Sequence, residues 1–258
     1  MNEIWKDRVV LVTGAGSGFG AAIAQRFAAA GAGVVACGRR RDRLEALAAE
    51  LGPGCCHSVV LDVRDRRAVE AAVATLPARF RDIDLLVNNA GLALGLEPAH
   101  AASLDDWEQM VDTNLKGLMY VTRAVLPGMV ERNRGHVVNI GSTAGTLPYP
   151  GGNIYGATKA AVAQFSANLL TDLVKTKVRV TNIEPGLCGG SEFSLVRFHG
   201  DEEKAANVYQ GTQPLTSEDV AESVFWAASL PAHVNISRIE MMPTCQAPAG
   251  WAVHREVT

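Results

Sequence analysis

The sequence lacks the features that mark several large classes of protein. It has no apolar run near the roughly 20 residues needed to span a bilayer. Its beginning, MNEIWKDRVVLVTG, has no apolar leader followed by a small-residue cleavage site. A formal net charge of -3 provides no basic field for a nucleic-acid backbone or an anionic membrane. We therefore expect a cytoplasmic, unexported protein with no nucleic-acid or membrane partner.

Cysteines are few and follow no metal-binding or disulfide pattern. The five cysteines are odd in number and include no Cys-x-x-Cys pair. Neither a disulfide framework nor a zinc site is therefore predicted, and we expect no metal. This cysteine usage fits a reducing cytoplasm.

What the sequence does contain is a regular alternation of short β-branched runs and alanine-rich helical stretches across its 258 residues. Near-continuous apolar strands separated by amphipathic helices are typical of a parallel sheet covered on both faces. We predict an α/β protein with a single domain, residues 1–258, built on a Rossmann-like doubly wound parallel sheet of about seven strands. The predicted strands are 7–14, 32–38, 56–63, 83–89, 135–142, 178–186 and 236–242.

The alternation breaks from Pro185 to about Gln213 and again after Pro243. Open α/β sheets bind ligands beyond the carboxyl ends of their strands, so function is expected there and in the first break. Residues from about 187 to 213 are predicted to form a substrate loop. Residues 243–258 are predicted to form a C-terminal tail, with Trp251 available to dock on a neighbouring subunit.

A glycine-rich turn, TGAGSGFG, follows the first predicted strand and leads into a helix. Glycines let the backbone approach a pyrophosphate, whose charge the helix N-terminus stabilises. A tight turn without a ligand is the alternative, but the strand–turn–helix order favours dinucleotide binding. The residues predicted to bind it are Gly14, Gly16, Ser17, Gly18, Phe19 and Gly20.

The second predicted strand ends in CGRRRDRL and not in an acidic residue. An acidic side chain would bond a free ribose 2′-hydroxyl, whereas Arg39 and Arg40 offer forked donors to a 2′-phosphate. The alternative is that these arginines only solvate the next helix, although a helix N-terminus disfavours cations. NADP is thus predicted in preference to NAD.

Further cofactor contacts are predicted at the ends of the third and fourth strands. Asp62, followed by Val63, is placed to reach the adenine or, alternatively, to cap the next helix. The stretch NNAG puts the small residues Asn88, Ala90 and Gly91 where the sheet meets the dinucleotide.

Four residues suggest acid–base chemistry. Tyr155 and Lys159 lie on one face of a predicted helix, with Cβ atoms about 6 Å apart. For Tyr155 to act near neutrality, its phenolate needs about 4 kcal/mol of preferential stabilisation, which an ammonium and an oxidised nicotinamide can supply. Ser142 is placed to bond the substrate oxygen, and Asn114 to hold a water that links Lys159 to solvent through its side chain and a locally disturbed backbone.

TGAGSGFG, NNAG, Asn114, Ser142 and YGATK together resemble the motif set of the short-chain dehydrogenase/reductase family, over essentially the whole chain. The resemblance implies a Rossmann-fold, usually tetrameric oxidoreductase. It also implies that Tyr155 is the catalytic acid/base, that Lys159 binds the nicotinamide ribose and lowers the tyrosine pKa, and that Ser142 positions the carbonyl. Asn114 then completes the proton relay.

The same resemblance assigns Pro185, Gly186 and Leu187 to the nicotinamide end of the cofactor. One position departs from the family pattern, because Gly190 stands where a threonine usually contacts the carboxamide, with Ser191 one residue later. Ser191 or the main chain is expected to make that contact.

Stretches such as NNAGLALGLEPAH and IEPGLCGGSEFSLVRF more closely resemble NADP-dependent 3-hydroxy acid dehydrogenases, which oxidise serine and related acids and reduce malonic semialdehyde. Sulfoacetaldehyde reductases, which form isethionate, are also similar. The predicted function is hydride transfer between NADP and a small anionic 3-hydroxy acid or its semialdehyde. A sulfoacetaldehyde reductase and a non-catalytic NADP-sensing protein are the alternatives, and a partner-binding protein has no supporting segment.

The predicted substrate pocket contains Thr143 and Tyr149, and Gln246 if the tail folds back. Gly189 and Gly190 are expected to be hinges of the substrate loop, with Phe193, Leu195, Val196 and Phe198 excluding water. Arg197 is expected either to bind an anionic substrate or to pair with Glu192, Asp201 or Glu202. The apolar helices that carry Asn114 and Tyr155 suggest a homotetramer.

Overall fold

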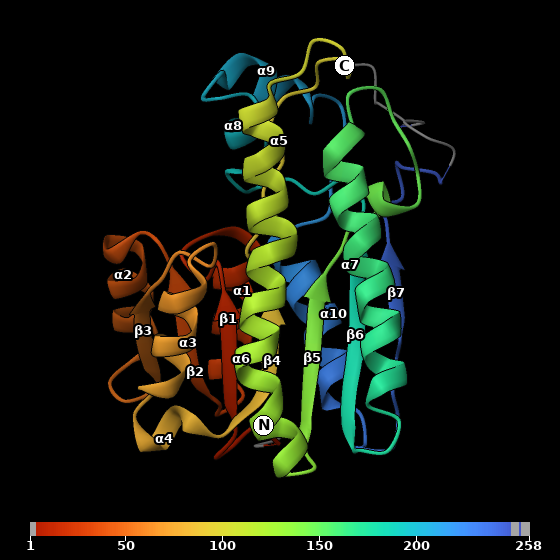
Figure 1. Ribbon diagram of the computed structural model, residues 1–258. Helices are drawn as coiled ribbons and strands as arrows, with labels where there is room; N and C mark the ends of the chain where they lie inside the picture. The colour runs from red at the N-terminus through yellow and green to blue at the C-terminus, as the bar shows by residue number, and fades with distance from the viewer. Residues whose placement is uncertain (1–3, 249–252, 254–258) are drawn as a thin grey trace.

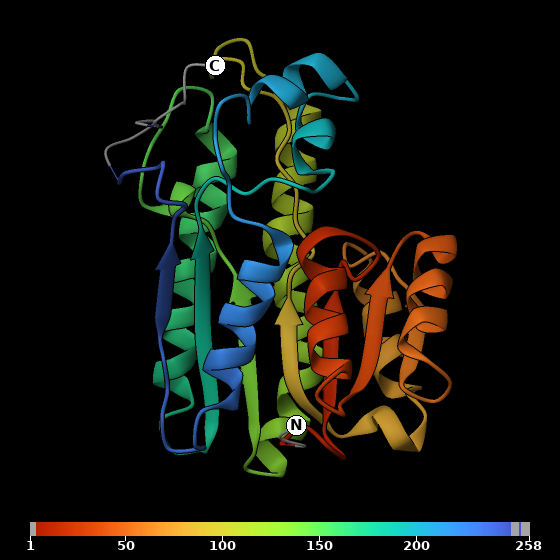
Figure 2. The same ribbon diagram turned by 180° about the vertical axis from the view of Figure 1, so that it is seen from behind.

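The computed structural model describes residues 4–248 and Val253. In this part of the chain, seven parallel strands form one sheet in the order β3-β2-β1-β4-β5-β6-β7, with helices on both faces (Figures 1 and 2). This confirms the predicted doubly wound fold. The strands are β1 (Val9–Thr13), β2 (Gly33–Gly38), β3 (Cys56–Val60), β4 (Ile83–Asn88), β5 (Gly135–Ile140), β6 (Val178–Pro185) and β7 (Arg238–Met241).

The strand order reverses between β1 and β4, which is where open α/β sheets bind their ligands. Helices α1, α2 and α10 cover one face of the sheet, and α3, α6 and α7 cover the other (Figures 1 and 2). The helices are α1 (Gly18–Ala28), α2 (Arg41–Leu51), α3 (Arg66–Ala74), α4 (Ala78–Arg81), α5 (Leu104–Val111), α6 (Leu118–Glu131), α7 (Asn153–Asp172), α8 (Phe193–Arg197), α9 (Glu202–Asn207) and α10 (Ser217–Ser229).

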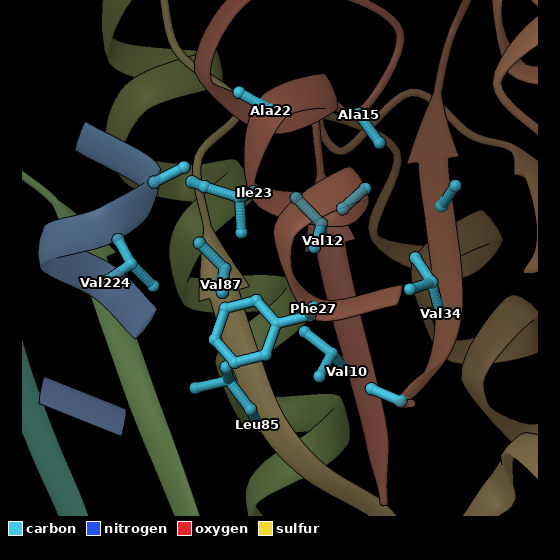
Figure 3. Close-up of a cluster of buried hydrophobic side chains, with 14 of the residues drawn as sticks. Val10, Val12, Ala15, Ala22, Ile23, Phe27, Val34, Leu85, Val87 and Val224 are labelled. Carbon is cyan, nitrogen blue, oxygen red and sulfur yellow. The ribbon is translucent and has the colours of Figure 1, made fainter. Parts of the chain in front are cut away.

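Strand β1 shows why the strands read as continuous apolar runs. Val10 and Val12 pack with Phe27 of α1 on one face of the sheet (Figure 3), whereas Val9 and Leu11 pack in the cluster on the opposite face. Each such side chain stabilises the fold by about 1.5–3 kcal/mol when fully buried. The sheet therefore holds its strand ends in fixed positions.

The α-helical structure of the segment that carries Asn114 is interrupted. A π-helix of six residues, Asp112–Gly117, lies between α5 and α6. Such segments are rare and occur frequently at functional sites. The disturbed backbone expected at Asn114 is therefore present.

Helices α8 and α9 belong to the predicted substrate loop and lie beyond the carboxyl ends of the strands, beside α5 (Figures 1 and 2). The main chain of Gly95 donates a hydrogen bond of 2.9 Å to the carbonyl of Arg197, which fixes the end of α8. Within the described residues, no helix has both the length and the apolarity of a membrane span. The predicted docking residue Trp251 lies outside the described residues.

Candidate active site

A cavity of about 430 Å³ runs along the carboxyl ends of the strands, within the size range of small-ligand sites. Most of the predicted site residues line it, from the glycine-rich turn to Arg197. The predicted residues that do not line it are Gly20, Asn88, Asn114 and, in the substrate loop, Gly189, Gly190, Leu195 and Phe198. The side chain of Asn88 instead donates hydrogen bonds to Thr122 and Asn139 inside the protein.

The glycine-rich turn is held by Asn89, which was not among the predicted site residues. Asn89 lines the cavity, and its side-chain amide donates to the carbonyl of Thr13 at 2.8 Å. Gly14 has φ +67°, and a Cβ there would lie 2.9 Å from the Asn89 amide nitrogen. The close packing of the turn thus requires glycine.

The start of α1 is available to an anion. Ser17, its N-cap residue, forms no side-chain cap hydrogen bond, and the first turn contains no acidic residue. The N–H groups and the positive end of the helix therefore remain available to a phosphate. These residues fit the pyrophosphate of a dinucleotide.

The arginines after β2 differ in their contacts. Arg40 donates two hydrogen bonds to Glu192 and one to Ser17. Arg39 lines the cavity and forms no ion pair within the described part of the chain. Arg39 is thus the guanidinium still available to a 2′-phosphate.

Asp62 does not cap the next helix. The cap of α3 is Asp65, whose side chain accepts from the main chain of Ala68. Asp62 lies on the cavity wall, and hydrogen bonds from Arg64 lower its carboxyl pKa. Its carboxylate is therefore ionised and faces the predicted adenosine end.

Tyr155, Lys159 and Ser142 come together at the other end of the cavity. The Lys159 ammonium donates a hydrogen bond of 2.8 Å to the Ile140 carbonyl, and its Nζ lies 5.8 Å from the centroid of the Tyr155 ring. Ser142 hydrogen-bonds Tyr155 and caps the short 3-10 turn that begins at Thr143. The phenol, the ammonium and the hydroxyl thus share one end of the cavity.

Burial dominates the electrostatics of this group. It raises the pKa of Tyr155 to about 12, and Tyr149 adds to the rise, whereas the Arg197 guanidinium and the Ser142 hydrogen bond oppose it. Burial lowers the pKa of Lys159 to about 8. In the structure Tyr155 is therefore protonated near neutrality and set to donate a proton.

Asn114 lies behind the cavity wall, next to Lys159. A Cβ on Gly91 would lie 3.2 Å from the Asn114 side-chain oxygen and 3.5 Å from Lys159 Nζ. The Asn114 amide donates to the Leu92 carbonyl and to Thr158, so both of its N–H groups are used. A relay water beside Lys159 would then depend on the main chain of the π-helix.

Arg197 faces the cavity and not the solvent. Its side chain is 8% exposed, and its carbon Cζ lies 5.3 Å from the Tyr155 ring centroid. Two of the expected alternative partners are engaged elsewhere, Glu192 with Arg40 and Asp201 with Lys204, and no ion pair joins Arg197 to Glu202 in the described residues. Arg197 instead donates to the Tyr149 hydroxyl, and its Nε is buried without a hydrogen-bond partner.

The predicted nicotinamide end differs from the family pattern for a backbone reason. Gly190 has φ +72°, a conformation in which a threonine would be strained. Ser191 lies near the glycine-rich turn, 3.2 Å from the position of a Cβ on Gly18. The described start of the tail reaches the cavity, because Gln246 lines it and accepts a 2.6 Å hydrogen bond from the main chain of Leu187.

The chain is similar to known dehydrogenases over most of its length. The family model described as short chain dehydrogenase matches residues 8–195. The chain is 65% identical over 247 residues to the NADP-dependent 3-hydroxy acid dehydrogenase YdfG of Salmonella typhi, covering 96% of this chain and 99% of the relative. It is 52% identical to the serine 3-dehydrogenase of Rhizobium radiobacter, covering 96% and 98%.

Among solved structures, the closed form of serine dehydrogenase complexed with NADP+ superposes with a TM-score of 0.93. That protein is 62% identical, and the match covers 96% of this chain and 100% of the other.

Proposed function

Because the chain belongs to the short chain dehydrogenase family, we propose that it is an NADP-dependent oxidoreductase acting on a small anionic 3-hydroxy acid or its semialdehyde. Relatives at 65% and 52% identity carry the names of a 3-hydroxy acid dehydrogenase and a serine 3-dehydrogenase. The match covers 96% of this chain and 99% and 98% of the two relatives.

The observation that carries the proposal is the buried guanidinium of Arg197 beside Tyr155. A buried charge is costly unless it is paired, and no carboxylate forms an ion pair with Arg197 in the described residues. A neutral phenol, that of Tyr149, is its side-chain partner. An anionic substrate group bound there would compensate the charge and bring the reacting carbon to Tyr155.

NADP would lie with its pyrophosphate at the start of α1 and its 2′-phosphate at Arg39. When bound, it supplies or accepts the hydride. Asp62, Ala90, Gly91 and the main chain from Pro185 to Leu187 complete the proposed cofactor contacts, with Gln246 beside the last of these.

The protein residues then handle the proton. Tyr155 donates it to the substrate oxygen during reduction and accepts it during oxidation, while Ser142 bonds the same oxygen. Lys159 anchors the nicotinamide ribose and, with the main chain of the π-helix at Asn114, connects Tyr155 to solvent. We further propose that residues 187–213 cover the substrate as a lid within a single NADP-binding domain.

The purified protein should oxidise serine and 3-hydroxypropionate with NADP, because both present a carboxylate to Arg197 and a hydroxyl to Tyr155. Nicotinamide absorbance measured with each substrate and with both NADP and NAD would check this. Higher catalytic efficiency with isethionate would favour the sulfoacetaldehyde reductase alternative. Cofactor binding without turnover of any alcohol or aldehyde would favour the sensing protein.

We also propose a cytoplasmic homotetramer. Met119 and Val130 of α6 are 42% and 39% exposed, and a subunit interface would cover such apolar side chains. Light scattering at micromolar concentration should give four times the mass of the 27.3 kDa chain. A monomer mass would contradict this proposal without affecting the catalytic one.

A further inference from the structure

The segment that contains α8 contacts both ends of the cavity. We define the α8 segment as residues 191–200. Its residues Glu192 and Arg197 both line the cavity and lie five positions apart. At the proposed cofactor end of the cavity, Glu192 contacts Arg40. At the proposed substrate end, Arg197 contacts Tyr149 and Tyr155. One short helix therefore links the proposed cofactor and substrate sites.

The contact at the cofactor end is bidentate. Arg40 Nη1 donates to Glu192 Oε1 at 3.0 Å, and Arg40 Nη2 donates to Oε2 at 2.7 Å. Arg43 lies 3.8 Å from the same carboxylate, and Ser17 accepts a hydrogen bond from Arg40. Because Glu192 is the N-cap residue of α8 and Arg40 that of α2, the ion pair joins two walls of the cavity.

At the substrate end, the α8 segment is attached to the opposite wall. Gly95 donates its main-chain N–H to the Arg197 carbonyl, and His199 lies 3.1 Å from Asp106 of α5. Arg197 also donates to the Tyr149 hydroxyl. These contacts and the Arg40–Glu192 pair fasten the segment on both sides.

The arginines at the cofactor end of the cavity can bind a phosphate as well as Glu192. Glu192 pairs with Arg40 and Arg43, and Asp42 also lies 3.9 Å from Arg43. Arg39 forms no ion pair within the described residues, so a 2′-phosphate can bind there while Glu192 keeps its partners. The carboxylate therefore need not be displaced when the cofactor binds.

We propose that the Arg40–Glu192 ion pair is a clasp that closes the α8 segment over bound dinucleotide and so sets the position of Arg197. Glu192 is then a positioning residue, because it acts on the substrate through α8. This inference rests on the proposed dinucleotide-dependent function. It adds that one ion pair affects both the rate at which the cofactor leaves and the affinity for the substrate.

The test is the rate at which NADPH and NADH leave the full-length protein, followed by stopped-flow fluorescence, in the wild type and in Glu192→Gln. Loss of a bidentate surface pair should accelerate release of both cofactors about 3- to 10-fold. The KM for 3-hydroxypropionate should rise by a similar factor with kcat not reduced. In an Arg40→Gln background, Glu192→Gln should cause no further acceleration.

Two matched variants separate the clasp from other effects. Glu45→Gln makes the same chemical change in the Arg41–Glu45 pair on the outer surface of α2 and should change neither rate. Arg39→Ala should weaken NADPH binding but leave NADH unchanged, because only NADPH carries the 2′-phosphate.

Three results would overturn the inference. Tighter NADPH binding by Glu192→Gln would mean that Glu192 competes with the 2′-phosphate. Unchanged release rates would mean that the pair is an ordinary surface contact. A wild-type protein that binds neither cofactor would refute the proposed function and the clasp together, which distinguishes that failure from the other two.

Discussion

Replacing Tyr155 by phenylalanine should lower the rate of hydride transfer about 10²- to 10⁴-fold, the usual contribution of a positioned acid–base group. The substitution removes only the hydroxyl, since the ring would still pack edge-on against Phe193, with centroids 5.9 Å apart. NADP affinity and thermal stability should change little. Single-turnover absorbance and calorimetric titration with NADP would measure the two effects separately.

The control for this change is Tyr120→Phe, because Tyr120 is a tyrosine of α6 that does not line the cavity. It should retain wild-type activity. If Tyr155→Phe kept more than a tenth of wild-type turnover, another group would have to carry the proton.

The direction of the pH dependence follows from the Tyr155 pKa. Burial raises it to about 12, so the phenol form prevails at neutral pH in the structure. Oxidation requires the phenolate and should accelerate as pH rises toward 12, whereas reduction uses the phenol and should stay nearly constant until pH approaches 12. Tyr155→Phe should remove the rise in the oxidation rate.

Replacing Arg197 by alanine should reduce catalytic efficiency with an anionic 3-hydroxy acid about 30- to 1000-fold. This range corresponds to the roughly 2–4 kcal/mol that follow from removing one partner of a buried, hydrogen-bonded charge pair. A neutral alcohol of similar size should lose little, because it has no charge for the guanidinium to bind. Steady-state kinetics with both substrates would give the ratio.

Two companion variants sharpen this experiment. Arg197→Met keeps an unbranched apolar stem beside the Tyr149 and Tyr155 rings. The catalytic efficiency that it loses is therefore due to the missing charge and not to missing packing. Arg197→Lys keeps the charge without the planar fork and should fall between wild type and alanine. Equal losses on anionic and neutral substrates in all three variants would make Arg197 a support for its loop.

The fold was predictable because each strand carries its own signal. β1 is apolar from Val9 to Val12 since both of its faces are buried, and the glycine-rich turn directly follows it. The cluster of Tyr155 and Lys159 was predictable because one helical turn separates them. These inferences depend on local spacing, which the sequence displays directly.

The orientation of α8 was not predictable in the same way. The apolar residues of the segment were expected to face the cavity, yet Leu195 and Phe198 do not line it, and Ser194 and Arg197 are the buried residues of the helix. A helix of five residues is too short for periodicity to fix its inner face. Distant contacts, such as that between Gly95 and Arg197, decide the orientation.

The neighbouring residues Asn88 and Asn89 have different roles, which the sequence alone did not indicate. Asn88 ends β4 with its side chain inside the protein, while Asn89 holds the glycine-rich turn. Neighbouring side chains of a strand point to opposite faces of the sheet, so a shift of one position changes which groups a side chain contacts.

The left-handed backbone at Gly190 restricts the routes by which this protein can diverge. A single substitution that introduced the family's threonine there would place a β-branched side chain at φ +72°. The turn would have to change before, or together with, that side chain. Natural or laboratory evolution toward the usual carboxamide contact therefore needs at least two coordinated steps, and libraries that vary Gly190 alone should return mostly glycine.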